Sequence, residues 1–166
     1  MSPRYRKILV PVDFSAASCA ALEHALFLAG RLDATIEVLH VWQTPDTMPP
    51  STLRIAPHGI ERGIGAHARA AAERALSEFC EPYADAGVPL RFELVFGQPV
   101  PVIRTRAEEG RHDLLVMGTH GRGGLPRLLL GSVAEELVRS APCPVLTVRA
   151  PPTEAARAAG GAPPRR

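Results

Sequence analysis

Five short apolar runs alternate along the chain with segments of helical character, and this alternation limits the possible folds more than any other feature. The runs lack a helical period, which is typical of strands buried in a parallel sheet, and they cover residues 7–14, 34–42, 90–97, 113–118 and 143–149. Helices are predicted from Ser15, as N-cap, to about Gly30, and over 66–87, 100–110 and 132–140. This order predicts an α/β fold, a three-layer αβα sandwich around a mainly parallel five-stranded sheet.

The length of 166 residues suits a single domain, which we expect to span residues 1–150. Residues 43–63 contain four prolines and no clear periodicity, so we predict a mobile surface loop there. Residues 151–166 are rich in Ala, Pro and Arg and cannot bury much apolar surface, so we predict a disordered C-terminal tail. Pro101 falls inside a predicted helix and is compatible with it only in the first turn.

Charge and cysteine content exclude several classes of partner. The chain has 19 basic and 17 acidic residues, and removing the three arginines and one glutamate of residues 151–166 leaves equal numbers. A neutral domain argues against binding of nucleic acid or membrane surfaces by bulk electrostatics. The three cysteines lie far apart without metal-ligand spacing, and no signal peptide or membrane span is recognisable. We therefore expect a cytoplasmic protein without disulfides or a protein-held metal.

In open parallel sheets, ligands bind beyond the carboxyl ends of the strands, near the point where the strand order reverses. This rule selects Asp13 after the first strand, Val41 and Trp42 at the end of the second, and the glycine-rich loop "GTHGRGGLPRLLLGS" that begins at Gly118. We expect the fold to bring these three places together.

The glycine-rich loop has two interpretations. Glycines let a phosphate approach backbone amides, and the helix predicted after Gly131 offers unpaired N–H groups at its first turn. The same glycines could also form only a flexible turn before an N-capped helix. Two known phosphate-binding motifs are excluded. The P-loop, G-x-x-x-x-G-K-S/T, needs a lysine that does not follow Gly131, and the dinucleotide-binding motif G-x-G-x-x-G needs glycines that "VPVDFS", at the end of the first strand, does not contain.

The chain resembles the universal stress protein family over about residues 5–150. The resemblance rests on "ILVPVDFS", on "VLHVW", and on "LLVMGTHGRGGLPRLLLGSVAEELVRSAPCPVLTVR". The last segment has the family's ATP-binding pattern of Gly118, two residues, Gly121, nine residues, Gly131 and Ser132. One branch of the family binds ATP through this pattern and another branch lacks it, so the resemblance is to the ATP-binding branch.

This resemblance implies a set of nucleotide-binding residues. Pro11, Val12 and Asp13 would line the nucleoside end, and Val41 would meet the adenine edge through its backbone. The ribose and phosphates would be held by Met117, Gly118, His120, Gly121, Gly131, Ser132 and Val133. Arg122 would balance phosphate charge or remain a solvated loop residue. Magnesium would arrive with the nucleotide, held mainly by phosphate oxygens and water.

Several of these residues have a structural alternative. Asp13 could support the turn after its strand, and Ser132 could be an ordinary N-cap. We interpret His120 as a positioning residue rather than a catalytic one, because no Asp or Glu near it in sequence could orient it as a base. His40 is interpreted as a packed or edge histidine and not as a ligand.

The sequence favours a regulatory binding module over an enzyme, because no nucleophile has a neighbouring base and no carboxylates pair in the loop. A slow ATPase or phosphotransferase, and a nucleotide-free interaction protein on the same fold, are the alternatives. The strand at 143–149 ends the predicted domain as an apolar edge, and family members commonly dimerise through it, so we expect a homodimer.

Overall fold

The computed structural model describes residues 5–43, 61–119 and 131–150, without the side chains of 61–66. In these ranges the chain forms β1 (Lys7–Pro11), α1 (Ala16–Leu32), β2 (Thr35–Trp42), α2 (Glu61–Cys80), the short 3-10 helix η2 (Glu81–Tyr83), β3 (Leu90–Phe96), α3 (Pro99–Glu109), β4 (Leu114–Gly118), α4 (Ser132–Ser140) and β5 (Val145–Val148). The predicted strands and helices are all present in the predicted order. Residues 44–60 of the predicted loop and the predicted tail, 151–166, lie outside the described residues.

The five strands form one sheet in the order β3-β2-β1-β4-β5, and each neighbouring pair is parallel. The chain builds outward from β1 to β3 and then crosses back to place β4 on the other side of β1. The strand order therefore reverses between β1 and β4. At the opposite end of these two strands, Asp113 accepts hydrogen bonds from the backbone N–H groups of Arg6 and Lys7, which aligns them.

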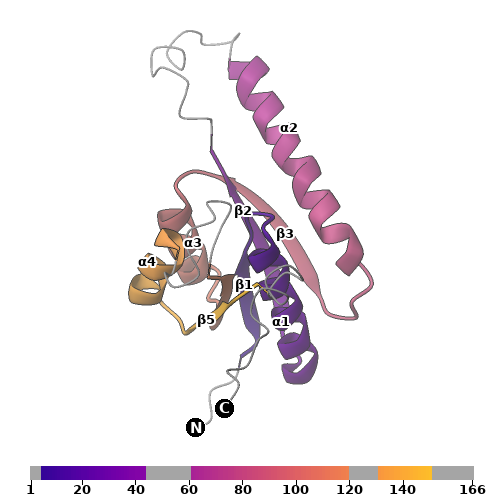
Figure 1. Ribbon diagram of the computed structural model, residues 1–166, viewed down its shortest axis with the longest axis vertical. Helices are drawn as coiled ribbons and strands as arrows, with labels where there is room; N and C mark the ends of the chain where they lie inside the picture. The colour runs from indigo at the N-terminus through magenta and orange to yellow at the C-terminus, as the bar shows by residue number, and fades with distance from the viewer. Residues whose placement is uncertain (1–4, 44–60, 120–130, 151–166) are drawn as a thin grey trace, which may run out of the picture.

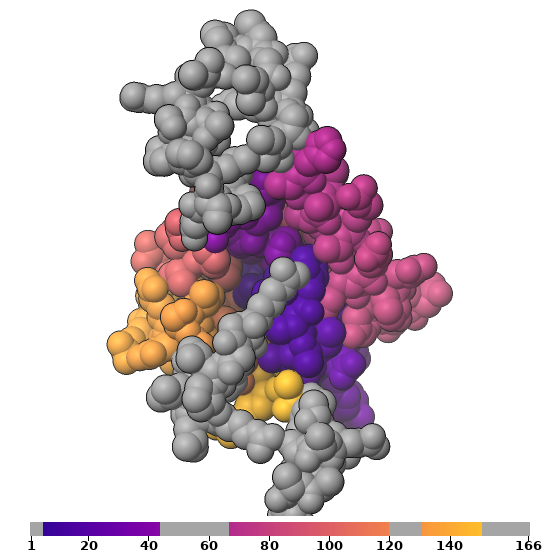
Figure 2. Space-filling model, turned by 45° about the horizontal axis from the view of Figure 1, so that its top comes forward, coloured from indigo at the N-terminus to yellow at the C-terminus, as the bar shows by residue number. Residues whose placement is uncertain are grey.

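Helices cover both faces of the sheet, with α1 and α2 on one side and α3 and α4 on the other (Figure 1). Figure 2 shows α2 forming one side of the molecule and α3 with α4 the opposite side. Successive residues of β1 serve the two layers, because Ile8 and Val10 belong to the α1/α2 core while Leu9 belongs to the α3/α4 core. This double burial explains the continuous apolar run, and each fully buried side chain contributes about 1.5–3 kcal/mol. The predicted three-layer α/β fold is confirmed.

Some predicted boundaries are wrong. β1 ends at Pro11 rather than at residue 14, because the chain turns sharply at Phe14. α1 continues past Gly30 to Leu32, and Asp33 then adopts a left-handed conformation with φ 54° as its C-cap. α2 begins at Glu61, so the last residues of the predicted loop are helical, and it ends at Cys80. Pro99 and Pro101 both lie in the first turn of α3, as a proline in a helix requires.

Within the described ranges, no helix is long and apolar enough to cross a membrane.

Candidate functional site

The carboxyl ends of β1 and β4 lie side by side at the reversal of strand order, with β2 on the other side of β1. Pro11 ends β1 and is followed by Val12 and Asp13, while Met117 and Gly118 end β4. The predicted site residues that the structure describes are therefore brought to one end of the sheet, the end at which the strands have their carboxyl termini. His120, Gly121 and Arg122 lie outside the described residues.

The turn between β1 and α1 is held by its own polar groups. The Asp13 carboxylate accepts a hydrogen bond from the Ser15 N–H at 3.1 Å. Ser15 in turn is the N-cap of α1, where its hydroxyl oxygen accepts the Ser18 N–H at 3.2 Å. Phe14 between them has φ 64°, a left-handed conformation that side chains rarely adopt. Asp13 thus has the turn-supporting role, and because a carboxylate accepts several hydrogen bonds, a ligand contact is compatible with it.

His40 on β2 also supports this turn, which the sequence did not reveal. Its Nδ1 atom lies 2.8 Å from the Val12 carbonyl oxygen, and its ring lies 4.2 Å from the Phe14 ring, centroid to centroid. The Phe14 ring also contacts Phe79 of α2 at 5.5 Å. The expectation of a packed histidine agrees with these contacts, but its bond to the site backbone depends on residues 28 positions apart.

Val41 presents backbone groups at the same carboxyl end of the sheet. Along β2, Thr35 donates to the Arg6 carbonyl and the Leu39 carbonyl accepts from Val12, so alternate residues of β2 face β1. Val41 continues this series by two residues, beyond the last pair of the ladder, Pro11 with Leu39. Its N–H and C=O therefore point past the end of β1.

Gly118 is a glycine for a reason that the sequence did not indicate. A Cβ atom at this position would lie 2.8 Å from both the carbonyl carbon and the Cβ of Ala17 in α1, closer than real contacts allow. Ala17 is buried, so neither it nor β4 has room to move. The Met117 side chain, in turn, is packed in the α3/α4 core. These residues can therefore meet a ligand mainly through their backbone.

The N-terminus of α4 is tied directly to the end of β4. The Gly131 N–H donates to the Thr119 carbonyl at 2.7 Å, and the Thr119 N–H donates to the Val148 carbonyl at 2.9 Å. Gly131 is the N-cap and Ser132 is the first helical residue, so the alternative of Ser132 as N-cap is wrong. Ser132 is exposed, while Val133 packs partly against the α3/α4 core. The first N–H groups of an α-helix have no intrahelical partner, so the start of α4 beside β4 has the geometry that suits an anion.

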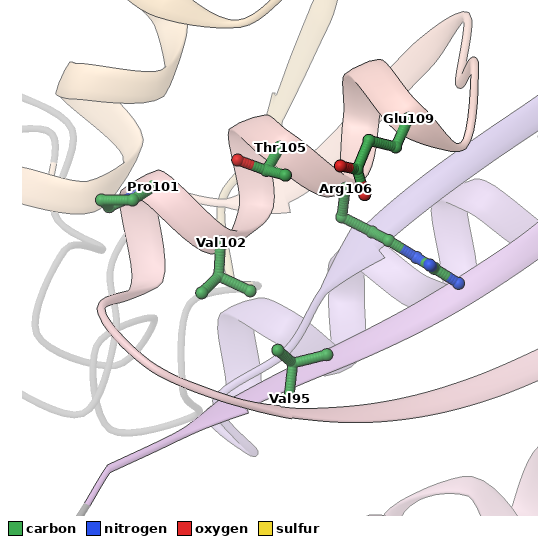
Figure 3. A pocket seen from close by; sticks show the side chains of 6 residues that line it. All are labelled: Val95, Pro101, Val102, Thr105, Arg106 and Glu109. Atoms are coloured by element: carbon green, nitrogen blue, oxygen red, sulfur yellow. The ribbon is translucent and has the colours of Figure 1, made fainter.

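A second polar region lies on the α3 side of the sheet, away from the end of β1. Arg106 of α3 pairs with Glu37 of β2 and Glu93 of β3, and His112 Nε2 lies 3.5 Å from a Glu37 oxygen. The bond to Glu37 raises the pKa of the Arg106 guanidinium above its ordinary value, so the group stays charged. Beside it is an open hollow of about 280 Å³ lined by Val95, Pro101, Val102, Thr105, Arg106 and Glu109 (Figure 3).

Comparison with known proteins identifies the relatives of this chain. The sequence model of the protein family described as "Universal stress protein family" matches residues 4–149. The chain is a member of this family. It is 35% identical over 150 residues to universal stress protein MJ0531 of Methanocaldococcus jannaschii, covering 90% of this chain and 85% of that protein.

Two solved structures of the same fold illustrate the similarity. Hypothetical protein MJ0577 is 28% identical with a TM-score of 0.75, covering 89% of this universal stress protein and 97% of that chain. A universal stress protein family protein from Arabidopsis thaliana, solved with AMP bound, is 25% identical with a TM-score of 0.57, covering 90% of this chain and 94% of that one.

Proposed function

We propose that this universal stress protein binds ATP at the carboxyl edge of its sheet and acts as a nucleotide-dependent regulatory module. The observation that supports the proposal is that the carboxyl ends of β2, β1 and β4 are neighbours at the reversal of strand order, where Gly131 at the start of α4 is hydrogen-bonded to Thr119 after β4. Ligands of open α/β sheets bind at this position. The AMP-bound relative from Arabidopsis thaliana supports an adenine nucleotide as the ligand.

In this proposal the backbone does most of the binding. The phosphates would meet the first N–H groups of α4, where each hydrogen bond to a charged partner contributes about 1.5–3 kcal/mol and the helix dipole about 0.3–1 kcal/mol. The base would lie at Val41, and Asp13 would contact the ribose or adenine. Magnesium would accompany the nucleotide, held by phosphate oxygens and water.

A regulatory role is favoured over catalysis by the chemistry of the edge. The described side chains at this end of the sheet include Asp13 and Ser132. The Asp13 carboxylate is hydrogen-bonded within its own turn. Neither residue forms a pair of a nucleophile and a positioned base. We propose slow hydrolysis at most, in the cytoplasm, where the free thiols of Cys19, Cys80 and Cys143 would remain reduced.

We further propose a homodimer formed through β5. This strand is an edge of the sheet, and Leu146 on it is a large apolar side chain that remains 36% exposed. An unpaired apolar edge favours pairing with a second copy. Light scattering at tens of micromolar should give twice the chain mass, and a monomer would contradict this part of the proposal.

The first experiment asks what the purified protein carries and binds. The protein is denatured, and any released nucleotide is identified by mass spectrometry. ATP with magnesium is then titrated into the stripped, refolded protein while heat and free phosphate are followed together. We expect micromolar affinity and phosphate release slower than about one per minute, far below ordinary enzyme turnover. No binding by a folded protein would contradict the proposal.

A charge variant tests the phosphate position separately. Ser132→Asp places a carboxylate in the first turn of α4, which suits the helix dipole but repels phosphates. We expect ATP affinity to fall at least about tenfold while adenosine, which has no phosphate, binds as before. An unchanged ATP affinity, or equal losses for ATP and adenosine, would contradict a phosphate position at the start of α4.

A further inference from the structure

The hydrogen-bond ladder between β1 and β2 changes its partners at the end of β1. The two strands pair from Lys7 with Thr35 to Pro11 with Leu39. Before the ladder, Thr35 N–H donates to the Arg6 carbonyl, and after it, Val12 N–H donates to the Leu39 carbonyl. In a continuing parallel ladder, the next bond would run from the Val41 N–H to the Val12 carbonyl.

The His40 side chain occupies that position instead. Its Nδ1 atom is 2.8 Å from the Val12 carbonyl oxygen, and since a carbonyl only accepts, Nδ1 carries the proton. Within the part of the chain that the structure describes, this carbonyl receives the imidazole, and the structure shows no backbone bond from Val41 to it. The imidazole thus satisfies the Val12 carbonyl while the ladder stops one bond early.

The position of the imidazole is set by the turn it supports. Its ring packs 4.2 Å from the ring of Phe14, whose backbone is held in a left-handed conformation with φ 64°. Phe14 is itself 5.5 Å from Phe79 of α2. Contacts on the α1/α2 side of the sheet therefore keep the imidazole at the Val12 carbonyl.

We infer that His40 is a positioning residue for the adenine base: by taking the Val12 carbonyl it leaves the Val41 N–H and C=O to read the base edge. This inference rests on the proposed function. An N–H donor beside a C=O acceptor matches adenine, which presents N1 as an acceptor and its 6-amino group as a donor. Hypoxanthine carries a proton on N1 and an oxygen at position 6, so the same backbone groups disfavour it.

Two variants separate the hydrogen bond of His40 from its ring. His40→Asn retains a side-chain N–H donor at about the reach of Nδ1, and His40→Phe retains a ring to pack on Phe14 but cannot donate. His24→Phe is the matched control, because His24 Nδ1 also contacts a backbone carbonyl, that of Ala20 at 2.9 Å, at an exposed position of α1. Circular dichroism and thermal melting confirm that each full-length variant is folded.

The first readout needs no nucleotide. Hydrogen exchange followed by NMR should show a rapidly exchanging Val41 amide in the wild-type chain and in His40→Asn. In His40→Phe the ladder can close onto the Val12 carbonyl, so we expect Val41 exchange to slow at least about tenfold. A Val41 amide that is already protected in the wild-type chain overturns the inference, whether or not nucleotide binds.

The second readout is the preference for ATP over ITP, measured by titration. We expect a preference of about tenfold or more in the wild-type chain and in His24→Phe, a loss to about twofold or less in His40→Phe, and recovery in His40→Asn. An unchanged preference in His40→Phe overturns the inference. If Val41 exchanges rapidly as expected but the wild-type chain binds no adenine nucleotide, the proposed function fails and the opening of the ladder stands.

Discussion

β2 carries two polar side chains three residues apart that serve opposite faces of the sheet in different ways. Glu37 faces α3, where it pairs with Arg106 and approaches the buried His112. His40 faces the α1/α2 side, where it contacts Phe14 and holds the Val12 carbonyl. In the Glu37 cluster, formed with Arg106 and His112, charged side chains pair with one another. In the His40 cluster, formed with Phe14 and Val12, a side-chain hydrogen bond replaces a backbone one beside the candidate site. The Glu37 cluster stabilises the packing of α3 on the sheet, and in our proposal the His40 cluster leaves backbone groups of Val41 for a ligand.

The surroundings of the two clusters explain this difference. The Glu37 side chain is only 14% exposed and that of His112 only 3%, so water cannot replace their partners. Breaking such a group is costly because it leaves buried polar atoms unpaired. The His40 group lies where the strands end, and a ligand there can meet backbone groups that the ladder no longer uses.

The largest expected effect tests whether the core beneath the His40 face is dry. Cys80 of α2 is buried in this core, and burial raises the pKa of its thiol from 9.0 to about 12. At pH 8, alkylation by iodoacetamide should be about a thousandfold slower in the native protein than in urea, because the thiolate is the reactive form. Mass spectrometry of a digest would measure the rate at each cysteine.

The half-buried Cys19 and Cys143 provide the internal control and should be modified first. The pKa of Cys80 also predicts a pH effect on stability. The unfolded thiol ionises near its ordinary pKa of 9.0 and the native one only near 12, so stability should fall as the pH rises through this window. Rapid alkylation of Cys80 would mean that α2 opens readily from the sheet.

The next prediction concerns Gly118, where packing and the candidate site coincide. A Cβ there would contact the Ala17 backbone at 2.8 Å, so Gly118→Ala should destabilise the fold by about 2 kcal/mol and weaken ATP binding as well. Urea unfolding measures the first effect and titration the second. Gly30→Ala is the control, because its Cβ would meet only Val88 at 4.0 Å and should stabilise α1 by about 0.5–1 kcal/mol. Similar stability for both variants would contradict the close contact.

The Glu37 cluster should affect stability without affecting binding. Glu37→Ala leaves Arg106 and His112 without their shared partner, and we expect a loss of about 2 kcal/mol by urea unfolding. ATP affinity should stay within about twofold, since α3 lies on the other face from the His40 cluster. The control is Glu73→Ala, which breaks an exposed pair with Arg69 on α2 and should cost about 0.5 kcal/mol or less. Equal costs would show that the cluster is no stronger than a surface pair.

The smallest expected effect is the reverse case, a substitution that changes ATP binding but not stability. Ser132→Ala should weaken ATP binding by about 1 kcal/mol, because backbone amides carry most of the phosphate contact. Stability should be unchanged, since Gly131 and not Ser132 caps α4. A stability loss typical of a removed N-cap, about 1 kcal/mol, would contradict this assignment. Titration and thermal melting of the same sample measure both quantities.

Local sequence patterns were sufficient for the elements and their order, because strand and helix periods depend on residues a few positions apart. They also located the candidate site, since ligands of parallel sheets bind beyond the carboxyl ends of strands. The precise ends of elements were less accurate. β1 stops at Pro11 and the chain turns at Phe14 with φ 64°, where the Phe14 ring packs against His40 and Phe79, contacts that no neighbouring residue predicts.

By itself, the sequence determined the α/β alternation, the glycine spacing after Gly118 and the family to which they point. Only the tertiary structure decided that Gly118 packs closely on Ala17, that His40 donates a hydrogen bond to the Val12 carbonyl, and that Glu37 forms an ion pair with Arg106. These contacts join residues 28 to 101 positions apart in the sequence. The physical reason is that periodicity reports which face a residue occupies, whereas its partner on that face exists only once the layers have packed.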